Sequence, residues 1–178
     1  MDIDELNKKI FNRCANINSI KGFEIITEAL VYKIYDLYGR NTLLSMLYQI
    51  GSLPGKQIAD RIKKQYNKEV FGLEEAFEIL FKELKDFYSV QIKEVEESDE
   101  KLRMIIENYC FLREPISHRK KLKYGKAFCR INKGYFEVAL KELLGDKIKN
   151  VEINYLETDD DRDACIEEVI FYKNTNIP

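Results

Sequence analysis

The spacing of the apolar residues changes along the chain, and this change constrains the fold more than any other feature of the sequence. Between Gly22 and Phe87 the apolar residues recur at steps of three and four, the period of a helix with one buried side. From Val90 they alternate with polar residues, which is typical of a strand with one buried face. Helical spacing returns at about Ala127, and alternation returns at Val151. The order predicts an α+β fold in which N-terminal helices pack on an antiparallel sheet of two hairpins, with a late helix between the hairpins.

Glycines divide the helical half into four predicted helices. Gly39 is expected to end the first, and a second helix, 41–51, is expected to end at a turn over 52–55, a segment rich in Gly and Pro. A third helix is expected from Ile58. The fourth has the widest apolar stripe, formed by Leu73, Ala76, Phe77, Leu80, Phe81, Leu84 and Phe87.

The second half predicts two hairpins and their turns. A charged turn over 96–100 separates the first two strands, and an acidic loop over 157–163 separates the last two. Gly145 is the expected end of the late helix. The inward face of the second strand is expected to carry Leu102, Met104, Ile106, Asn108 and Cys110, and that of the last strand Cys165, Val169 and Phe171.

Length and charge exclude several classes of protein. The chain has 178 residues, a formal net charge of -2 and no stretch near the roughly 20 apolar residues of a membrane helix. A generally basic nucleic-acid binder and a membrane-spanning protein are therefore not expected. The N-terminus is acidic where a secretory signal is basic, so we expect a cytoplasmic location.

Isolated motifs give little support for catalysis. No dinucleotide-binding, P-loop or zinc-protease motif occurs, so dinucleotide redox chemistry, nucleotide hydrolysis and zinc proteolysis have no support, and the sequence favours a binding protein over an enzyme without deciding between them. The basic cluster 119–123, extended by Lys126 and Arg130, is either a solvated loop or a contact for phosphates or an acidic partner.

Four cysteines lie far apart without a CxxC pair, and their spacing alone favours buried thiols over a metal site.

Three stretches nevertheless carry a resemblance to a known family. They are 48–59 with its Gly-Pro-Gly punctuation, 128–145 with an early Cys, a Gly and a terminal Leu-Gly, and 151–155 followed at a distance by Cys165. Together they resemble the vinyl-4-reductase-like, hydrocarbon-binding domain family, which is related in fold to TRAPP subunits and haem NO-binding sensor domains. The resemblance implies a single domain over 21–178, preceded by an N-terminal extension over 1–20.

The resemblance also implies a structural zinc site. Zinc-containing members take ligands from positions that match Cys129, Glu152 and Cys165. The remaining hairpin position is Tyr155, a poor zinc ligand, so Cys110 or His118 would have to complete a tetrahedral set.

Family members bind apolar small molecules between helices and sheet, and this implies the function. The chain is expected to sense or carry a hydrocarbon or aromatic ligand, to form a homodimer and to act through an effector protein. The alternative is a structural adaptor with a filled core, and a tetrapyrrole vinyl reductase would need a hydride donor for which no binding motif exists. The expected ligand-binding residues are Phe77, Leu80, Phe81, Met104, Ile106, Asn108 and Phe136.

Overall fold

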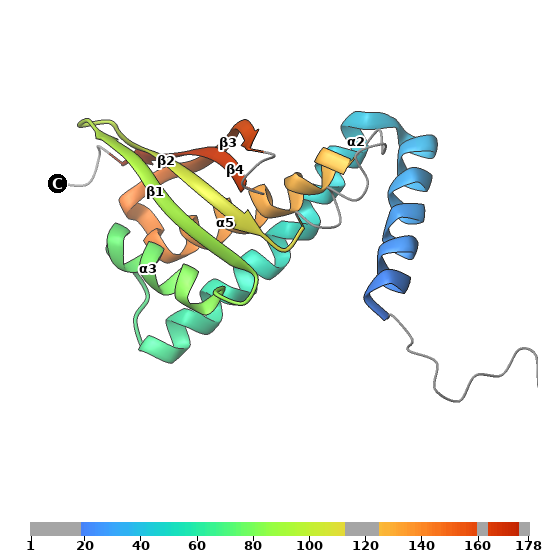
Figure 1. Cartoon of the computed structure of the whole chain (residues 1–178). Coiled ribbons are helices and arrows are strands. Elements are labelled where there is room, and N and C mark those ends of the chain that lie inside the picture. The colour runs from blue at the N-terminus through green and yellow to red at the C-terminus, as the bar shows by residue number, and fades with distance from the viewer. Residues whose placement is uncertain (1–18, 113–124, 160–163, 175–178) are drawn as a thin grey trace, which may run out of the picture.

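The computed structural model describes residues 19–112, 125–159 and 164–174, and it confirms the α+β fold (Figure 1). The helical half contains two helices and the second half one, with short 3-10 turns on either side of the last. The elements are α2 (Ser19–Tyr66), α3 (Leu73–Glu83), β1 (Tyr88–Glu97), β2 (Lys101–Cys110), α5 (Cys129–Leu144), β3 (Ile148–Asp159) and β4 (Ala164–Lys173). The predicted hairpins, the late helix and its end at Gly145 are all present.

The four strands form one antiparallel sheet in the order β1-β2-β4-β3. The two hairpins are joined through their second strands, with Asn108 of β2 opposite Cys165 of β4. Alternate residues of each strand face the helices, and this inward face includes Met104, Ile153 and Val169 of the main core. The predicted alternation therefore assigns the correct residues to the core.

Helix α5 is the centre of the domain because it packs against β3 on one side and against α2 on the other (Figure 1). Its inward residues, among them Phe136, Leu140 and Leu143, are almost completely buried. Helix α3 packs on α5 and on β1, which closes the core below the first hairpin.

The predicted turn over 52–55 is wrong, because α2 continues as a helix through Pro54 to Tyr66. Glycines in this segment serve helix packing: a Cβ at Gly51 would overlap the carbonyl oxygen of Ile131 in α5, and one at Gly55 would overlap that of Tyr135. Gly134 of α5 has the reciprocal role, since its Cβ would overlap the Tyr48 carbonyl oxygen. The three glycines let the backbones of α2 and α5 come into contact. Helix packing, and not a turn, therefore explains the glycines of the 51–55 segment.

Gly39 does interrupt α2, as predicted, with φ 77° and ψ 177°. The segment before it, Ser19–Tyr38, projects away from the sheet and α5, and we call it the arm (Figure 1). Val31 of the arm is buried against Leu43 and Leu47 beyond the bend. Six large apolar side chains of the arm are more than half exposed, namely Phe23, Ile25, Ile26, Leu30, Leu37 and Tyr38.

Of the helices in the described ranges, none combines the length and the apolar run that crossing a membrane requires.

Candidate functional site

A hollow of about 370 Å³ lies between α3 and the first hairpin. Phe77 and Phe81 of α3 form one wall, while Val90, Ile92 and Met104 of the hairpin form the other. Glu74 and Glu78 lie at its rim. We call it the apolar hollow, and it contains Phe77, Phe81 and Met104 of the predicted ligand-binding set.

The other predicted ligand-binding residues lie deeper. Leu80, Ile106 and Phe136 are almost completely buried in the core. The ring of Phe136 contacts Phe81 at 5.3 Å between centroids and Tyr88 at 4.7 Å. Aromatic rings therefore connect the apolar hollow to the interior of the domain. Their tilted and edge-to-face orientations are the ones that aromatic pairs prefer.

A polar pair is buried on the inward face of the sheet. Asn108 of β2 and Glu167 of β4 are each 1% exposed, and the Asn108 side-chain amide donates to Glu167 Oε1 at 2.9 Å. The other two oxygens of the pair, Asn108 Oδ1 and Glu167 Oε2, have no hydrogen-bond partner. Burial raises the pKa of Glu167 to about 7, although the bond from Asn108 acts in the opposite direction. A carboxyl group with this pKa is partly protonated at neutral pH.

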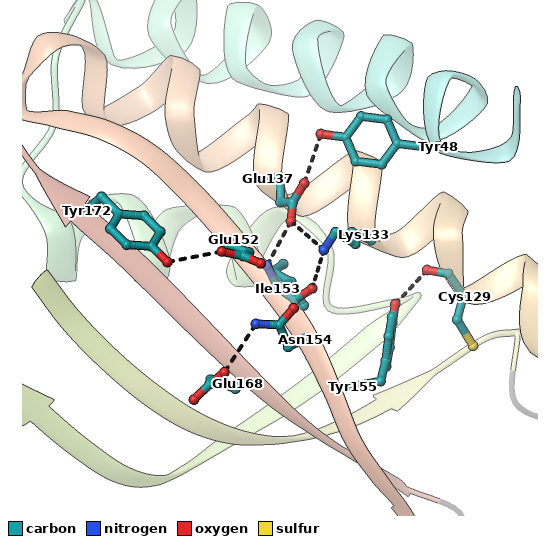
Figure 2. A network of polar contacts seen from close by, with 10 residues as sticks. All are labelled: Tyr48, Cys129, Lys133, Glu137, Glu152, Ile153, Asn154, Tyr155, Glu168 and Tyr172. Atoms are coloured by element: carbon teal, nitrogen blue, oxygen red, sulfur yellow. Dashed lines mark hydrogen bonds and ion pairs between the residues drawn. The ribbon is translucent and has the colours of Figure 1, made fainter. Parts of the chain in front are cut away.

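Three thiols lie near this pair, around the hydroxyl of Tyr155. Tyr155 is 37% exposed, but its hydroxyl points toward α5 and donates to the carbonyl oxygen of Cys129 at 2.5 Å (Figure 2). Burial raises the pKa of Tyr155 well above its usual value, and the nearby Glu167, Cys129, Cys110 and Cys165 raise it further. The structure thus brings Cys110, Cys129 and Cys165, three of the predicted metal ligands, into one region.

Glu152 does not join this region. It lies between the buried Val151 and Ile153 on β3, so it faces the opposite side of the sheet, where it accepts a hydrogen bond from the Tyr172 hydroxyl at 3.0 Å (Figure 2). His118 lies outside the described residues. Within the described ranges, no three Cys, His, Asp or Glu side chains have an arrangement that could hold a metal ion. The described side chains alone do not form a zinc site, and because His118 lies outside them the zinc site stays a prediction.

A second polar network joins α2, α5 and β3 around Glu137 (Figure 2). Glu137 accepts from the Tyr48 hydroxyl at 2.8 Å and from the backbone N–H of Ile153 at 2.7 Å. Lys133 lies 3.3 Å from Glu137 and donates to the Ile153 carbonyl oxygen at 2.6 Å. Burial and Glu137 together raise the pKa of Tyr48 to about 12. This network is fully paired, which is what a buried charge requires for stability.

Sequence reasoning missed Glu167 and the Glu137 network. The burial of Glu167 could have been predicted from the sequence. Position 167 falls on the same strand face as Cys165, Val169 and Phe171, so a correct strand assignment already places its carboxylate in the core. For Glu137 no such signal exists, since its partners Tyr48 and Ile153 are set by tertiary packing.

Comparison with known proteins supports the fold assignment. No protein-family model matches the chain, and no curated protein is similar to it. The phenol-responsive sensory domain of the transcription activator PoxR, solved with phenol, is similar over 84% of this chain and 74% of its own, with 16% identity and a TM-score of 0.57. Trafficking protein particle complex subunit 3 from Naegleria fowleri, covalently bound to palmitic acid, is similar over 88% and 99%, with 15% identity and a TM-score of 0.50.

At these identities the likeness shows the fold alone. It confirms the expected relation to TRAPP subunits and sensor domains at the level of architecture. Membership of the vinyl-4-reductase-like family stays a prediction.

Proposed function

We propose that this domain binds a hydrophobic small molecule, and that the apolar hollow between α3 and the first hairpin is where the molecule enters. The observation that carries the proposal is the hollow itself, about 370 Å³ in volume with five apolar side chains in its walls. This volume lies in the range of small-molecule sites, which are mostly apolar with a few polar groups. The phenol bound to the sensory domain of similar fold supports the same class of ligand.

The hollow suits a ligand of the size of a single aromatic ring. Phe77 and Phe81 present their rings 4.7 Å apart between centroids, so an aromatic ligand can extend an existing cluster. Val90 in the opposite wall pairs with Asn108 across the strands, which places the buried polar pair next to the hollow. Asn108 is then the polar group that a ligand hydroxyl or amine would reach.

Ile92→Glu is expected to weaken toluene binding about 10-fold or more, because a carboxylate in the wall must be desolvated when an apolar ligand enters. The measurement is a two-dimensional NMR titration that follows the amides of α3 and β1. The matched control is Val95→Glu, since Val95 lies on the same strand, is 53% exposed against 46% for Ile92, and does not line the hollow. Equal toluene affinity for the two variants would overturn the proposed site.

The exposed arm favours a second role in protein interaction. Phe23, Leu30 and Leu37 are spaced by seven residues and Ile26 lies between the first two, the pattern of a helix that pairs with another helix. We propose that a second copy of this chain covers the arm, because a two-fold pair buries the same stripe on both copies.

Leu30→Glu is expected to convert the dimer into a monomer, measured by sedimentation equilibrium. Ile25→Glu is the control, because Ile25 is as exposed as Leu30 (57% against 58%) but lies off the heptad stripe, and it should stay dimeric. A parent protein that is monomeric at 100 μM would contradict pairing through the arm and favour an adaptor whose arm binds a different protein.

A further inference from the structure

A cleft of about 330 Å³ lies at the other end of the domain, between the bend of α2, the first turn of α5 and β3. Its apolar floor includes Leu43 and Ile153, both almost completely buried, and the half-exposed ring of Tyr155 forms one side. Figure 2 shows part of this wall, with Lys133, Ile153 and Tyr155 close together. None of the residues of this cleft lines the apolar hollow.

The charges that line the cleft are all positive. Arg40, Arg130 and Lys133 contribute cationic side chains, and the described lining contains no carboxylate. Lys133 is already neutralised, because it pairs with Glu137 at 3.3 Å and donates to the Ile153 carbonyl oxygen. Among the described residues, neither Arg40 nor Arg130 has an ion-pair partner. Within the described part of the chain, the cleft therefore carries two guanidinium groups without an ion-pair partner, although the whole chain has a formal net charge of -2.

The local backbone holds these two arginines at the cleft. Arg40 directly follows Gly39, where the positive φ bends α2, and it lines the cleft at this bend. Arg130 lies in the first turn of α5, where the positive end of the helix dipole adds to the field on an anion. Guanidinium groups bind carboxylates with paired hydrogen bonds, and the floor below them is apolar.

We infer that this cleft binds an organic anion, an aromatic or aliphatic carboxylate whose charged group lies between Arg40 and Arg130 and whose apolar part packs against the accessible surface of Leu44 and Tyr155. The inference is independent of the proposed function, because its ligand, its residues and its place in the fold differ from those of the apolar hollow.

The test compares 2-naphthoate with its neutral isostere 2-naphthamide by isothermal titration calorimetry at pH 8. We expect 2-naphthoate to bind at least about 10-fold more tightly, since only the anion forms an ion pair with the two guanidinium groups and offers two equivalent oxygens for bidentate hydrogen bonds. Arg40→Gln and Arg130→Gln should each lower the 2-naphthoate affinity about 10-fold and leave that of 2-naphthamide unchanged. Arg61→Gln is the matched control, because Arg61 lies on α2 in an ion pair with Glu83 and should bind as the parent does.

Equal affinity for the two compounds, or an equal loss in Arg61→Gln, would overturn the inference. Ile92→Glu distinguishes the two sites: it should leave 2-naphthoate binding intact, and loss of that binding would assign the anion to the apolar hollow and refute the cleft.

Discussion

Gly51→Ala is expected to lower the free energy of unfolding by at least about 3 kcal/mol, the upper part of the range for overpacked positions. The added Cβ would overlap the carbonyl oxygen of Ile131, and because that atom belongs to a helix backbone it moves only if α5 moves. Gly134→Ala should have a similar effect, since its Cβ would overlap the Tyr48 carbonyl oxygen. Urea unfolding followed by circular dichroism measures both.

Gly22→Ala is the matched control for these variants. Gly22 is also a helical glycine of α2, but a Cβ there meets no atom within 4 Å. Alanine is the better helix former by about 1 kcal/mol, so this variant should be as stable as the parent or slightly more so. Parent-like stability of Gly51→Ala would mean that α2 and α5 do not pack backbone to backbone as described.

These glycines also show how far the sequence predicts the fold. Periodicity alone places the sheet and α5, because alternation and helical spacing report which side of an element is buried, as for Met104 and Phe136. It fails at 51–55, since a glycine that permits helix contact and a glycine that permits a turn look the same in one sequence. The deciding information is the position of α5, which is a tertiary property.

The candidate site follows the same division. Phe77, Phe81 and Met104, which belong to the predicted ligand-binding set, line the apolar hollow, whereas Leu80 and Phe136, which share the same stripes, are core residues. An amphipathic stripe identifies the inward face, but the depth of each residue depends on the element opposite. The cleft is a second example. The sequence predicts the bend at Gly39 beside Arg40, but it does not show that Arg130, ninety residues later, lines the same cleft.

Glu167 is expected to make the domain less stable as the pH rises from about 4.5 to about 7. Burial raises its folded-state pKa from 4.5 to about 7, so in this window the folded state holds a proton that the unfolded state has released. The stabilisation is complete below the unfolded pKa and is lost as the pH passes the folded pKa. At about 1.4 kcal/mol per pH unit, the loss amounts to about 3 kcal/mol.

The geometry of the buried pair explains why the neutral form is favoured. Asn108 already donates to Glu167 Oε1, and the unpaired atoms are Glu167 Oε2 and Asn108 Oδ1. A proton on Glu167 Oε2 supplies the hydrogen-bond donor that this acid–amide pair lacks. The ionised carboxylate has only the one hydrogen bond from Asn108 among the described residues, and that partner carries no positive charge to balance it. Glutamine at 167 provides the same donor at every pH.

Glu167→Gln should therefore flatten the pH dependence, and urea unfolding at pH 5 and pH 8 measures it in parent and variant. Glu168→Gln is the control: hydrogen bonds from Arg103 and Asn154 lower the pKa of Glu168 from 4.5, so its stabilising contribution is complete above about pH 4.5 and does not change between pH 5 and pH 8. That variant should keep the full destabilisation between pH 5 and pH 8. If Glu167→Gln loses as much stability as the parent, Glu167 is not protonated in the folded state. The polar group beside the apolar hollow would then be a carboxylate, which favours a cationic ligand over a neutral one.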